Sequence, residues 1–225
     1  MNTADIIRLV IIGIGAYAIG NINPSIIIGK IKGIDIRKEG SGNAGMTNTI
    51  RVMGLTAGII VFIVDVMKAF IAVSIGYNLG GEPGAMAAFA GVVLGHCFPA
   101  VFGFKGGKGV VTTAVAILMC NPIVFAILFL LFVIIVLFTK YISLGSVVCV
   151  MLYPLLLDSI SRIFTGSPTP YVVFAMITAV VVVVKHWGNI KRLAAGKESK
   201  FSFKKSVKAP EEKTEQSVEE NKEDK

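Results

Sequence analysis

Charged residues are scarce in this chain. They make up 16% of its 225 residues, whereas hydrophobic residues make up 54%. The mean hydropathy of +0.77 is well above that of an ordinary soluble domain. This composition excludes a soluble globular protein and predicts a polytopic membrane protein. The chain has 22 Lys and Arg but only 14 Asp and Glu. This excess of positive charge makes an anionic ligand or a lipid surface the expected partner.

Cysteine is also rare, and familiar catalytic patterns are missing. Cys97, Cys120 and Cys149 lie apart in apolar stretches, so neither a disulfide framework nor a CxxC metal site is expected. Val101 stands five positions after His96, so there is no His-x4-Asp pair, and neither a GxSxG elbow nor a Cys-His-Asn set occurs. The sequence therefore predicts no metal and no cofactor.

Seven apolar stretches reach or approach the roughly 20 residues that a helix needs to cross a membrane. The expected fold is an all-α membrane protein with about seven transmembrane helices. Asn121-Pro122 predicts a break inside one long apolar run, because proline lacks an N–H and disfavours helix in the preceding residue. The predicted spans are Ile6–Ile28, Leu55–Asn78, Ala85–Phe104, Val110–Cys120, Ile123–Thr139, Leu144–Ile160 and Tyr171–Trp187.

The positions of Lys and Arg predict the orientation, because cytoplasmic loops retain these residues. An outer N-terminus and a cytoplasmic C-terminus place 19 of the 22 basic residues inside. We expect a transmembrane domain over residues 1–203 and a disordered charged tail over 204–225, which has few apolar residues to bury. Lys68 falls within the second span, three residues after Asp65, and we interpret the two as a buried ion pair that serves packing.

The first of two polar segments, which we call the first glycine segment, is GSGNAGMTNTIRVMG (residues 40–54). Its glycines permit positive φ and close approach of the backbone, and its polar side chains suit phosphate oxygens. The alternative is a solvated loop before a helix with Thr47 or Asn48 as N-cap. The candidate anion ligands are Ser41, Gly42, Asn43, Thr47, Asn48 and Arg51.

The second glycine segment is GHCFPAVFGFKGGKGVVTT (residues 95–113), with two lysines around a diglycine before a predicted helix. Exposed N–H groups at a helix start and two ammonium groups favour phosphate, although the spacing differs from a Walker A loop. Part of the loop is expected at membrane depth, lining a wet cavity. The alternative is two lysines that extend to the membrane interface. The candidate ligands are Lys105, Gly106, Gly107, Lys108 and Gly109.

Both histidines lie at the inner ends of predicted spans, where ionisable side chains usually serve function. His186 and Asn189 are three residues apart and share a helix face, so they could orient hydroxyl groups together. His96 lies beside the second glycine segment. Each histidine could instead be a satisfied interfacial residue. Ser143 could add a hydroxyl or cap the next helix.

These motifs make the sequence resemble the bacterial acyl-phosphate:glycerol-3-phosphate acyltransferases of the inner membrane, over nearly the whole chain. The two glycine segments are similar to that family's first and second motifs. The turn at Ser143, together with HWGNIKRLAAGKES from His186, is similar to the third. The departures are Met46, where Ala is usual, and Ala195, where Leu is common, and neither removes a polar group.

The resemblance implies transfer of a fatty acyl group from acyl phosphate to the 1-hydroxyl of sn-glycerol 3-phosphate. The products would be lysophosphatidic acid and phosphate, in the first acylation step of phospholipid synthesis. The candidate ligands of the glycine segments would bind phosphate, while Ser143, His186 and Asn189 would orient the glycerol hydroxyls, with His96 a further catalytic candidate. The proton acceptor could be a substrate phosphate oxygen or a histidine, and the resemblance favours the substrate.

The resemblance also implies a multi-pass protein of the bacterial plasma membrane with its active site on the cytoplasmic side. Its partners would be the two substrates and membrane lipids, with the enzyme that makes acyl phosphate as a further candidate and no nucleic acid. A transporter or anion channel would need access from both sides, yet the phosphate-suited residues gather on the inner face. A scaffold that binds anionic lipid through its tail would leave both glycine segments unexplained.

Overall fold

The computed structural model describes residues 2–200, which contain helices and no strand. The tail predicted for residues 204–225 lies outside the described residues. The elements in chain order are α1 Thr3–Gly20, α2 Pro24–Ile31, α3 Met46–Met53, α4 Leu55–Cys97, the 3-10 helix η1 Ala100–Phe102, α5 Val110–Cys120, α6 Pro122–Thr139, α7 Ile142–Thr165, α8 Val172–Lys185 and α9 Trp187–Ala194.

Four helical stretches among the described residues are long and apolar enough to cross a membrane. The pair α8 and α9, bent by 60°, would make a fifth. Large apolar side chains such as Phe138 and Ile11 remain exposed around the bundle, which suits lipid rather than water. The all-helical membrane fold is therefore confirmed, while seven spans and their orientation stay predictions. The four stretches are Thr3–Ile31, Leu55–Phe102, Pro122–Thr139 and Ile142–Thr165.

α4 is a hairpin of two antiparallel arms. Gly80 and Gly81 leave helical geometry, with φ of 61° at Gly81. A Cβ added to Gly76 would lie 2.5 Å from the Cβ of Ala88. In a straight helix, positions 76 and 88 would be about 18 Å apart. The chain therefore turns back at the two glycines, between the second and third predicted spans.

The first predicted span, Ile6–Ile28, is interrupted, which corrects its expected continuity. α1 ends at Gly20, and α2 begins at Pro24 in the first helical position. The Asn23 side chain caps α2 by accepting a hydrogen bond of 3.1 Å from the Ile26 N–H. A proline preceded by a capping residue thus starts a new helix within an apolar run.

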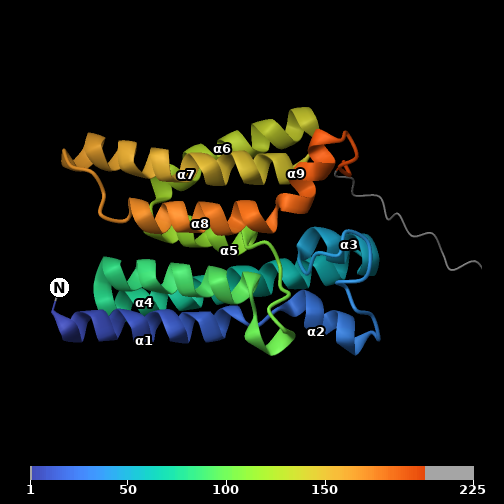
Figure 1. The fold of residues 1–225 in the computed structure, drawn as a ribbon, viewed down its shortest axis with the longest axis horizontal. Helices are drawn as coiled ribbons and strands as arrows, with labels where there is room; N and C mark the ends of the chain where they lie inside the picture. The colour runs from blue at the N-terminus through green and yellow to red at the C-terminus, as the bar shows by residue number, and fades with distance from the viewer. Residues whose placement is uncertain (1, 201–225) are drawn as a thin grey trace, which may run out of the picture.

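The predicted break at Asn121-Pro122 is confirmed. α5 ends at Cys120, and the Asn121 side chain accepts a 3.0 Å hydrogen bond from the Val124 N–H at the start of α6. The main core contains buried residues of α1, of both arms of α4, and of α5, α6, α7 and α8. Phe89 and Tyr153 are among them. The helices run lengthwise, with α2, α3 and α9 at one end and the N-terminus at the other (Figure 1).

Candidate active site

Asn48 holds the loop of the first glycine segment in place. α3 begins after Gly45, so neither suggested N-cap, Thr47 nor Asn48, is used. Asn48 is 1% exposed, its Oδ1 accepts a 2.8 Å hydrogen bond from the Ser41 N–H, and its Nδ2 donates to two carbonyls of the same loop at 3.2 and 3.0 Å. The Asn48 amide is thus engaged in shaping the loop, which leaves other residues of the segment to face a ligand.

The remaining candidates of this segment are more accessible. Ser41 and Gly42 are exposed, while Asn43, Thr47 and Arg51 are half-buried. No ion pair among residues 2–200 involves Arg51. A half-buried guanidinium without a carboxylate partner in that range is suited to a phosphate.

Gly107 of the second glycine segment packs directly against the first. A Cβ at Gly107 would collide with Nε2 of His96 and lie 2.8 Å from the carbonyl oxygen of Ala44. The Gly107 N–H also donates to the His96 carbonyl at 3.1 Å. Gly109, with φ of 76°, then leads into α5. Glycine is required at position 107 because no side chain fits between the imidazole and the neighbouring loop.

The third motif brings in Glu198, which the sequence analysis missed. Its Oε1 accepts hydrogen bonds from Ser143 Oγ at 2.8 Å and from Asn189 Nδ2 at 2.6 Å, and its Oε2 accepts one from Arg192 Nε at 2.8 Å. Lys108 Nζ donates to Oδ1 of the same Asn189. Three predicted site residues, Ser143, Asn189 and Lys108, therefore lie in one network. A glutamate in a Lys-rich stretch resembles a surface charge, and its place within the third motif was the available signal.

Positive charge concentrates around Lys108. Burial lowers the pKa of Lys108 to about 8; nearby Arg192, Arg51 and Lys185 add to this effect, and Glu198 opposes it. Burial also raises the pKa of Glu198, but hydrogen bonds from Asn189, Ser143 and Arg192 outweigh it and leave that pKa below its usual value. The cluster holds more positive than negative charge, so it favours an anionic ligand.

His186 is buried beside this network. It is 2% exposed, and its Nδ1 lies 2.8 Å from the Val182 carbonyl oxygen. A carbonyl only accepts, so Nδ1 carries the proton and Nε2 keeps a lone pair for a hydroxyl group. The preceding residue, Lys185, donates to the Cys97 carbonyl at 2.8 Å and lies 4.7 Å from the centre of the Phe98 ring. Lys185 was also missed, because a lysine at a span end is an ordinary interfacial residue.

His96 has different neighbours. It is 4% exposed, and its Nδ1 lies 2.8 Å from Lys68 Nζ. Lys68 in turn pairs with Asp65 at 2.7 Å, and both side chains are 3% exposed, which confirms the buried ion pair. His96, itself the second residue of the second glycine segment, therefore packs against Gly107 of that segment from inside the protein.

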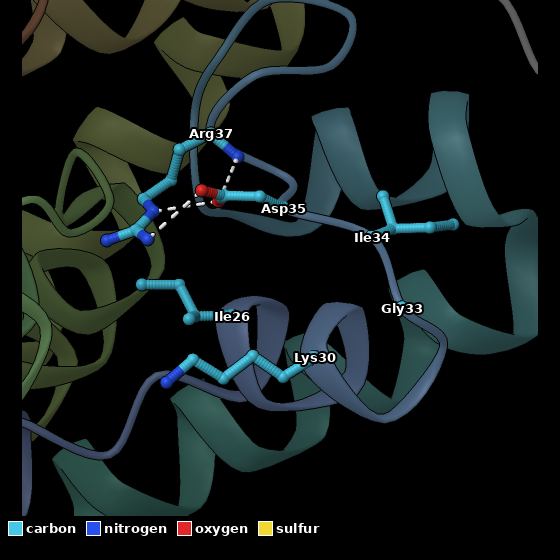
Figure 2. Close-up of a pocket in the computed structure, with 6 residues that line it drawn as sticks. All are labelled: Ile26, Lys30, Gly33, Ile34, Asp35 and Arg37. Carbon is cyan, nitrogen blue, oxygen red and sulfur yellow. Dashed lines mark hydrogen bonds and ion pairs between the residues drawn. The ribbon is translucent and has the colours of Figure 1, made fainter.

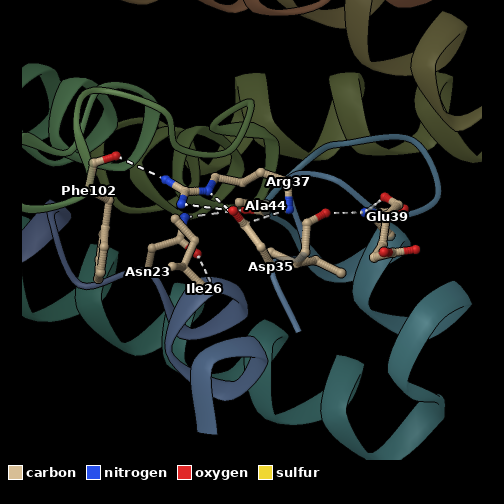
Figure 3. A network of polar contacts seen from close by, with 9 residues as sticks. Asn23, Ile26, Asp35, Arg37, Glu39, Ala44 and Phe102 are labelled. Carbon is tan, nitrogen blue, oxygen red and sulfur yellow. Dashed lines mark hydrogen bonds and ion pairs between the residues drawn. The ribbon is translucent and has the colours of Figure 1, made fainter. Parts of the chain in front are cut away.

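Arg37 joins the loop that precedes the first glycine segment to the second glycine segment, at a separate point (Figure 3). Its guanidinium pairs with Asp35 at 2.8 and 3.1 Å and donates to the Phe102 carbonyl at 3.1 Å. The hydrogen bonds from Arg37 lower the pKa of Asp35. A hollow of about 260 Å³ lies against α2 beside this pair (Figure 2). It contains none of the predicted ligands, so it is not the candidate site. Its lining residues are Ile26, Lys30, Gly33, Ile34, Asp35 and Arg37.

The arrangement supplies cations, amide N–H groups and hydroxyls at one end of the bundle. Over residues 2–200, no group of three or more His, Cys, Asp or Glu gathers that could hold a metal ion. Such a site can bind phosphate oxygens, neutralise charge that develops on them and orient a hydroxyl toward them.

Proteins of similar sequence are named glycerol-3-phosphate acyltransferases. The family described as glycerol-3-phosphate acyltransferase matches residues 10–196. A glycerol-3-phosphate acyltransferase of Thermoanaerobacter sp. (strain X514) is 42% identical over 200 residues, covering 88% of this chain and 98% of the relative. One of Clostridioides difficile (strain 630) is 41% identical over 208 residues, covering 89% and 99%.

Two solved structures of the same kind of enzyme are similar to this chain. The glycerol 3-phosphate form of PlsY (YgiH), an integral membrane glycerol 3-phosphate acyltransferase, superposes with a TM-score of 0.77 at 34% identity, covering 86% of this chain and 96% of that one. The lysophosphatidic acid form of PlsY (YgiH) gives a TM-score of 0.73 at 33% identity, covering 89% and 96%.

Proposed function

The chain belongs to the glycerol-3-phosphate acyltransferase family, and we propose that its acyl donor is an acyl phosphate and its acceptor the 1-hydroxyl of sn-glycerol 3-phosphate. As a member, it is an integral membrane acyltransferase of phospholipid synthesis. The lysophosphatidic acid form of a similar protein supports lysophosphatidic acid as the product. The released group would be inorganic phosphate.

The observation that carries this proposal is the contact between Lys108 and Asn189. It joins the second glycine segment to the third motif, with Arg51 of the first segment near enough to affect the Lys108 pKa. Both substrates carry a phosphate, and a site that binds two such groups needs several cations close together. Lys108, Arg51, Lys185 and Arg192 meet that need without a metal.

The reaction balances with these groups alone. The 1-hydroxyl oxygen attacks the carbonyl carbon of the acyl phosphate, a carbon–oxygen ester bond forms, and the carbon–oxygen bond to phosphate breaks with its electron pair. Cations around Lys108 stabilise the negative charge on the leaving phosphate. The hydroxyl proton passes to a phosphate oxygen. Since an acyl phosphate is a mixed anhydride with a good leaving group, positioning and charge stabilisation supply most of the catalysis.

The proposed proton acceptor is a phosphate oxygen of the substrate, with the two histidines in other roles. Nδ1 of His96 contacts Lys68, which forms a buried ion pair with Asp65. This nitrogen is therefore engaged inside the protein and is not available to a substrate. His186 has a free Nε2 lone pair that can accept a hydrogen bond from a glycerol hydroxyl and so orient it. A phosphate monoester, with a second ionisation near roughly pH 6, is a competent proton acceptor at neutral pH.

The site is proposed to face the cytoplasm of a bacterial cell. The candidate residues come from the end of the bundle where α2, α3 and α9 lie (Figure 1). The distribution of Lys and Arg assigns that end to the inner face. A polar acceptor would enter from water there while the acyl chain stays in lipid, and an enzyme that makes acyl phosphate would deliver its product at the same face.

A donor comparison tests the proposal. The purified protein in lipid nanodiscs would receive labelled glycerol 3-phosphate with acyl phosphate, acyl-CoA or acyl-carrier protein of one chain length, and labelled lysophosphatidic acid would be measured. We expect product with acyl phosphate and at least a hundredfold less with either thioester, because no His-x4-Asp pair is present to serve them. Comparable turnover with acyl-CoA would refute the proposed donor while leaving family membership intact.

A further inference from the structure

The ammonium group of Lys68 lies close to three oxygen and nitrogen atoms from different parts of the chain. Lys68 Nζ lies 2.7 Å from Asp65 Oδ1, 2.8 Å from His96 Nδ1 and 2.7 Å from the carbonyl oxygen of Ile22. The ammonium N–H groups donate to His96 Nδ1 and the Ile22 carbonyl, whereas Asp65 Oδ1 is held as an ion pair and accepts no hydrogen bond among the described residues. The Gly20 carbonyl is more distant, at 3.5 Å. A buried cation engaged by several partners holds them in fixed places.

This arrangement selects one form of His96. His96 Nδ1 lies 2.8 Å from Lys68 Nζ and 3.3 Å from Asp65 Oδ1. A charged ammonium can only donate, so Nδ1 accepts from Lys68, and the proton of the neutral ring lies on Nε2. Nε2 is the atom with which a Cβ at Gly107 would collide. The imidazole thus presents its N–H edge to the backbone of the second glycine segment.

The same cluster connects the α1–α2 break, both arms of α4 and Gly107. The Ile22 carbonyl belongs to the break between α1 and α2, while Lys68 and His96 come from opposite arms of the α4 hairpin. Gly107 lies between His96 and the Ala44 carbonyl, and Ala44 O also accepts a 3.3 Å hydrogen bond from Asn23 Nδ2. A shift of the imidazole would move the second glycine segment relative to the first.

We propose that Asp65 and Lys68 are positioning residues for the transfer reaction: they hold His96 with its Nε2–H against Gly107, and so set the two glycine segments at the separation that aligns donor and acceptor. This inference rests on the proposed function. It assigns His96 to positioning rather than to contact with the reacting atoms. A displacement of about 1 Å between bound reactants can cost on the order of a hundredfold in rate.

Two substitutions of His96 separate positioning from a merely structural role. In His96→Asn, the amide reaches the place of Nδ1, so Lys68 keeps its partner but the contact with Gly107 is lost. In His96→Gln, the longer amide reaches the place of Nε2 and keeps that contact. We expect kcat to fall at least a hundredfold in His96→Asn and only about tenfold in His96→Gln, which keeps the Gly107 contact without the Lys68 anchor, with KM for glycerol 3-phosphate changed less than threefold in both.

The number of folded sites is measured on the same samples. Equilibrium binding of labelled glycerol 3-phosphate, without donor, should give equal site occupancy per chain in wild type and both variants. The inference would be overturned if His96→Asn were as active as His96→Gln or more active. It would also be overturned if the number of binding sites fell in proportion to kcat. Equal loss in both variants down to the level of His96→Ala would assign His96 to proton transfer and overturn it too.

A charge-free version of the cluster gives an independent test. Asp65→Leu with Lys68→Met removes both buried charges together and leaves His96 without its anchor. We expect kcat to fall at least tenfold while the count of glycerol 3-phosphate sites stays constant. The matched control removes the exposed pair of Asp158 and Arg162, 2.7 Å apart on α7, and should keep full activity. Full activity without the buried pair would contradict positioning. If the wild-type protein itself does not use acyl phosphate, that result refutes the proposed donor and not the positioning role.

Discussion

The Lys108 ammonium donates to Oδ1 of Asn189, a residue 81 positions later in the chain. Lys108 stands just before α5 and Asn189 lies on α9, so the contact ties the second glycine segment to the last described helix. Glu198 extends the network to Ser143 and Arg192. Residues from distant parts of the sequence thus form one basic site.

The low pKa of Lys108 predicts a pH dependence. Its value of about 8 means that the charge is present below pH 8 and lost above it. Because kcat/KM reports on the free enzyme, kcat/KM should fall as the pH rises through about 8. Lys108→Arg keeps its charge to far higher pH, so this alkaline limb should move upward, whereas Lys30→Arg, at the separate hollow, should leave it in place. A limb that stays near pH 8 in Lys108→Arg would exclude Lys108 as its source.

Arg51→Lys should lose most activity although it keeps the charge. The guanidinium fork can bind two phosphate oxygens at once, and an ammonium cannot. We expect kcat/KM to fall about a hundredfold, which corresponds to about 3 kcal/mol of transition-state stabilisation. Arg162→Lys, an exposed Arg at the far end of α7, serves as the control and should change nothing. An Arg51→Lys variant as active as wild type would show that charge alone suffices.

His186 should behave as an acceptor for a hydroxyl group. Its Nδ1–H is engaged by the Val182 carbonyl, which leaves Nε2 to face the ligand. The carbonyl of His186→Gln can reach that place, so this variant should keep at least tenfold more activity than His186→Ala. The low-pH limb, set by the substrate phosphate near roughly pH 6, should persist in both variants. Loss of that limb in both, with flat residual activity, would make His186 the general base.

The orientation of the chain can be tested by cysteine labelling. In a background without the three native cysteines, Glu82→Cys at the α4 turn should react with an impermeant maleimide in intact cells. Lys200→Cys, an exposed position beyond α9, should react only after permeabilisation. The reverse pattern would invert the predicted orientation.

Local chemistry made much of the fold predictable. The break at Asn121-Pro122 and the ion pair of Asp65 and Lys68 depend on neighbours within a few residues, and both are present. The break before Pro24 was missed because the apolar run around it continues without a charge. The sequence could not show that Lys68 also reaches His96, since that contact needs the two arms of α4 to lie side by side.

The candidate site was partly predictable for the same reason. The composition of the two glycine segments predicts Arg51 and Lys108 as phosphate ligands, and the structure places Lys108 in one network with Asn189. Asn48, equally polar, turned out to hold its own loop, because a side-chain amide satisfies backbone groups as readily as it binds a ligand. Glu198 gains its place only when the chain after α9 folds back toward Ser143 and Asn189, which no local pattern encodes.

Direct acyl transfer from acyl phosphate to the 1-hydroxyl can be followed with an isotope label. Glycerol 3-phosphate labelled with oxygen-18 at the 1-hydroxyl would be mixed with acyl phosphate and an excess of purified protein, and the products of a single turnover analysed by mass spectrometry. We expect lysophosphatidic acid and phosphate in equal amounts, with all the label in the ester oxygen of lysophosphatidic acid and none in phosphate. Label in a glycerol bisphosphate, or phosphate released at the same rate without glycerol 3-phosphate, would contradict direct transfer.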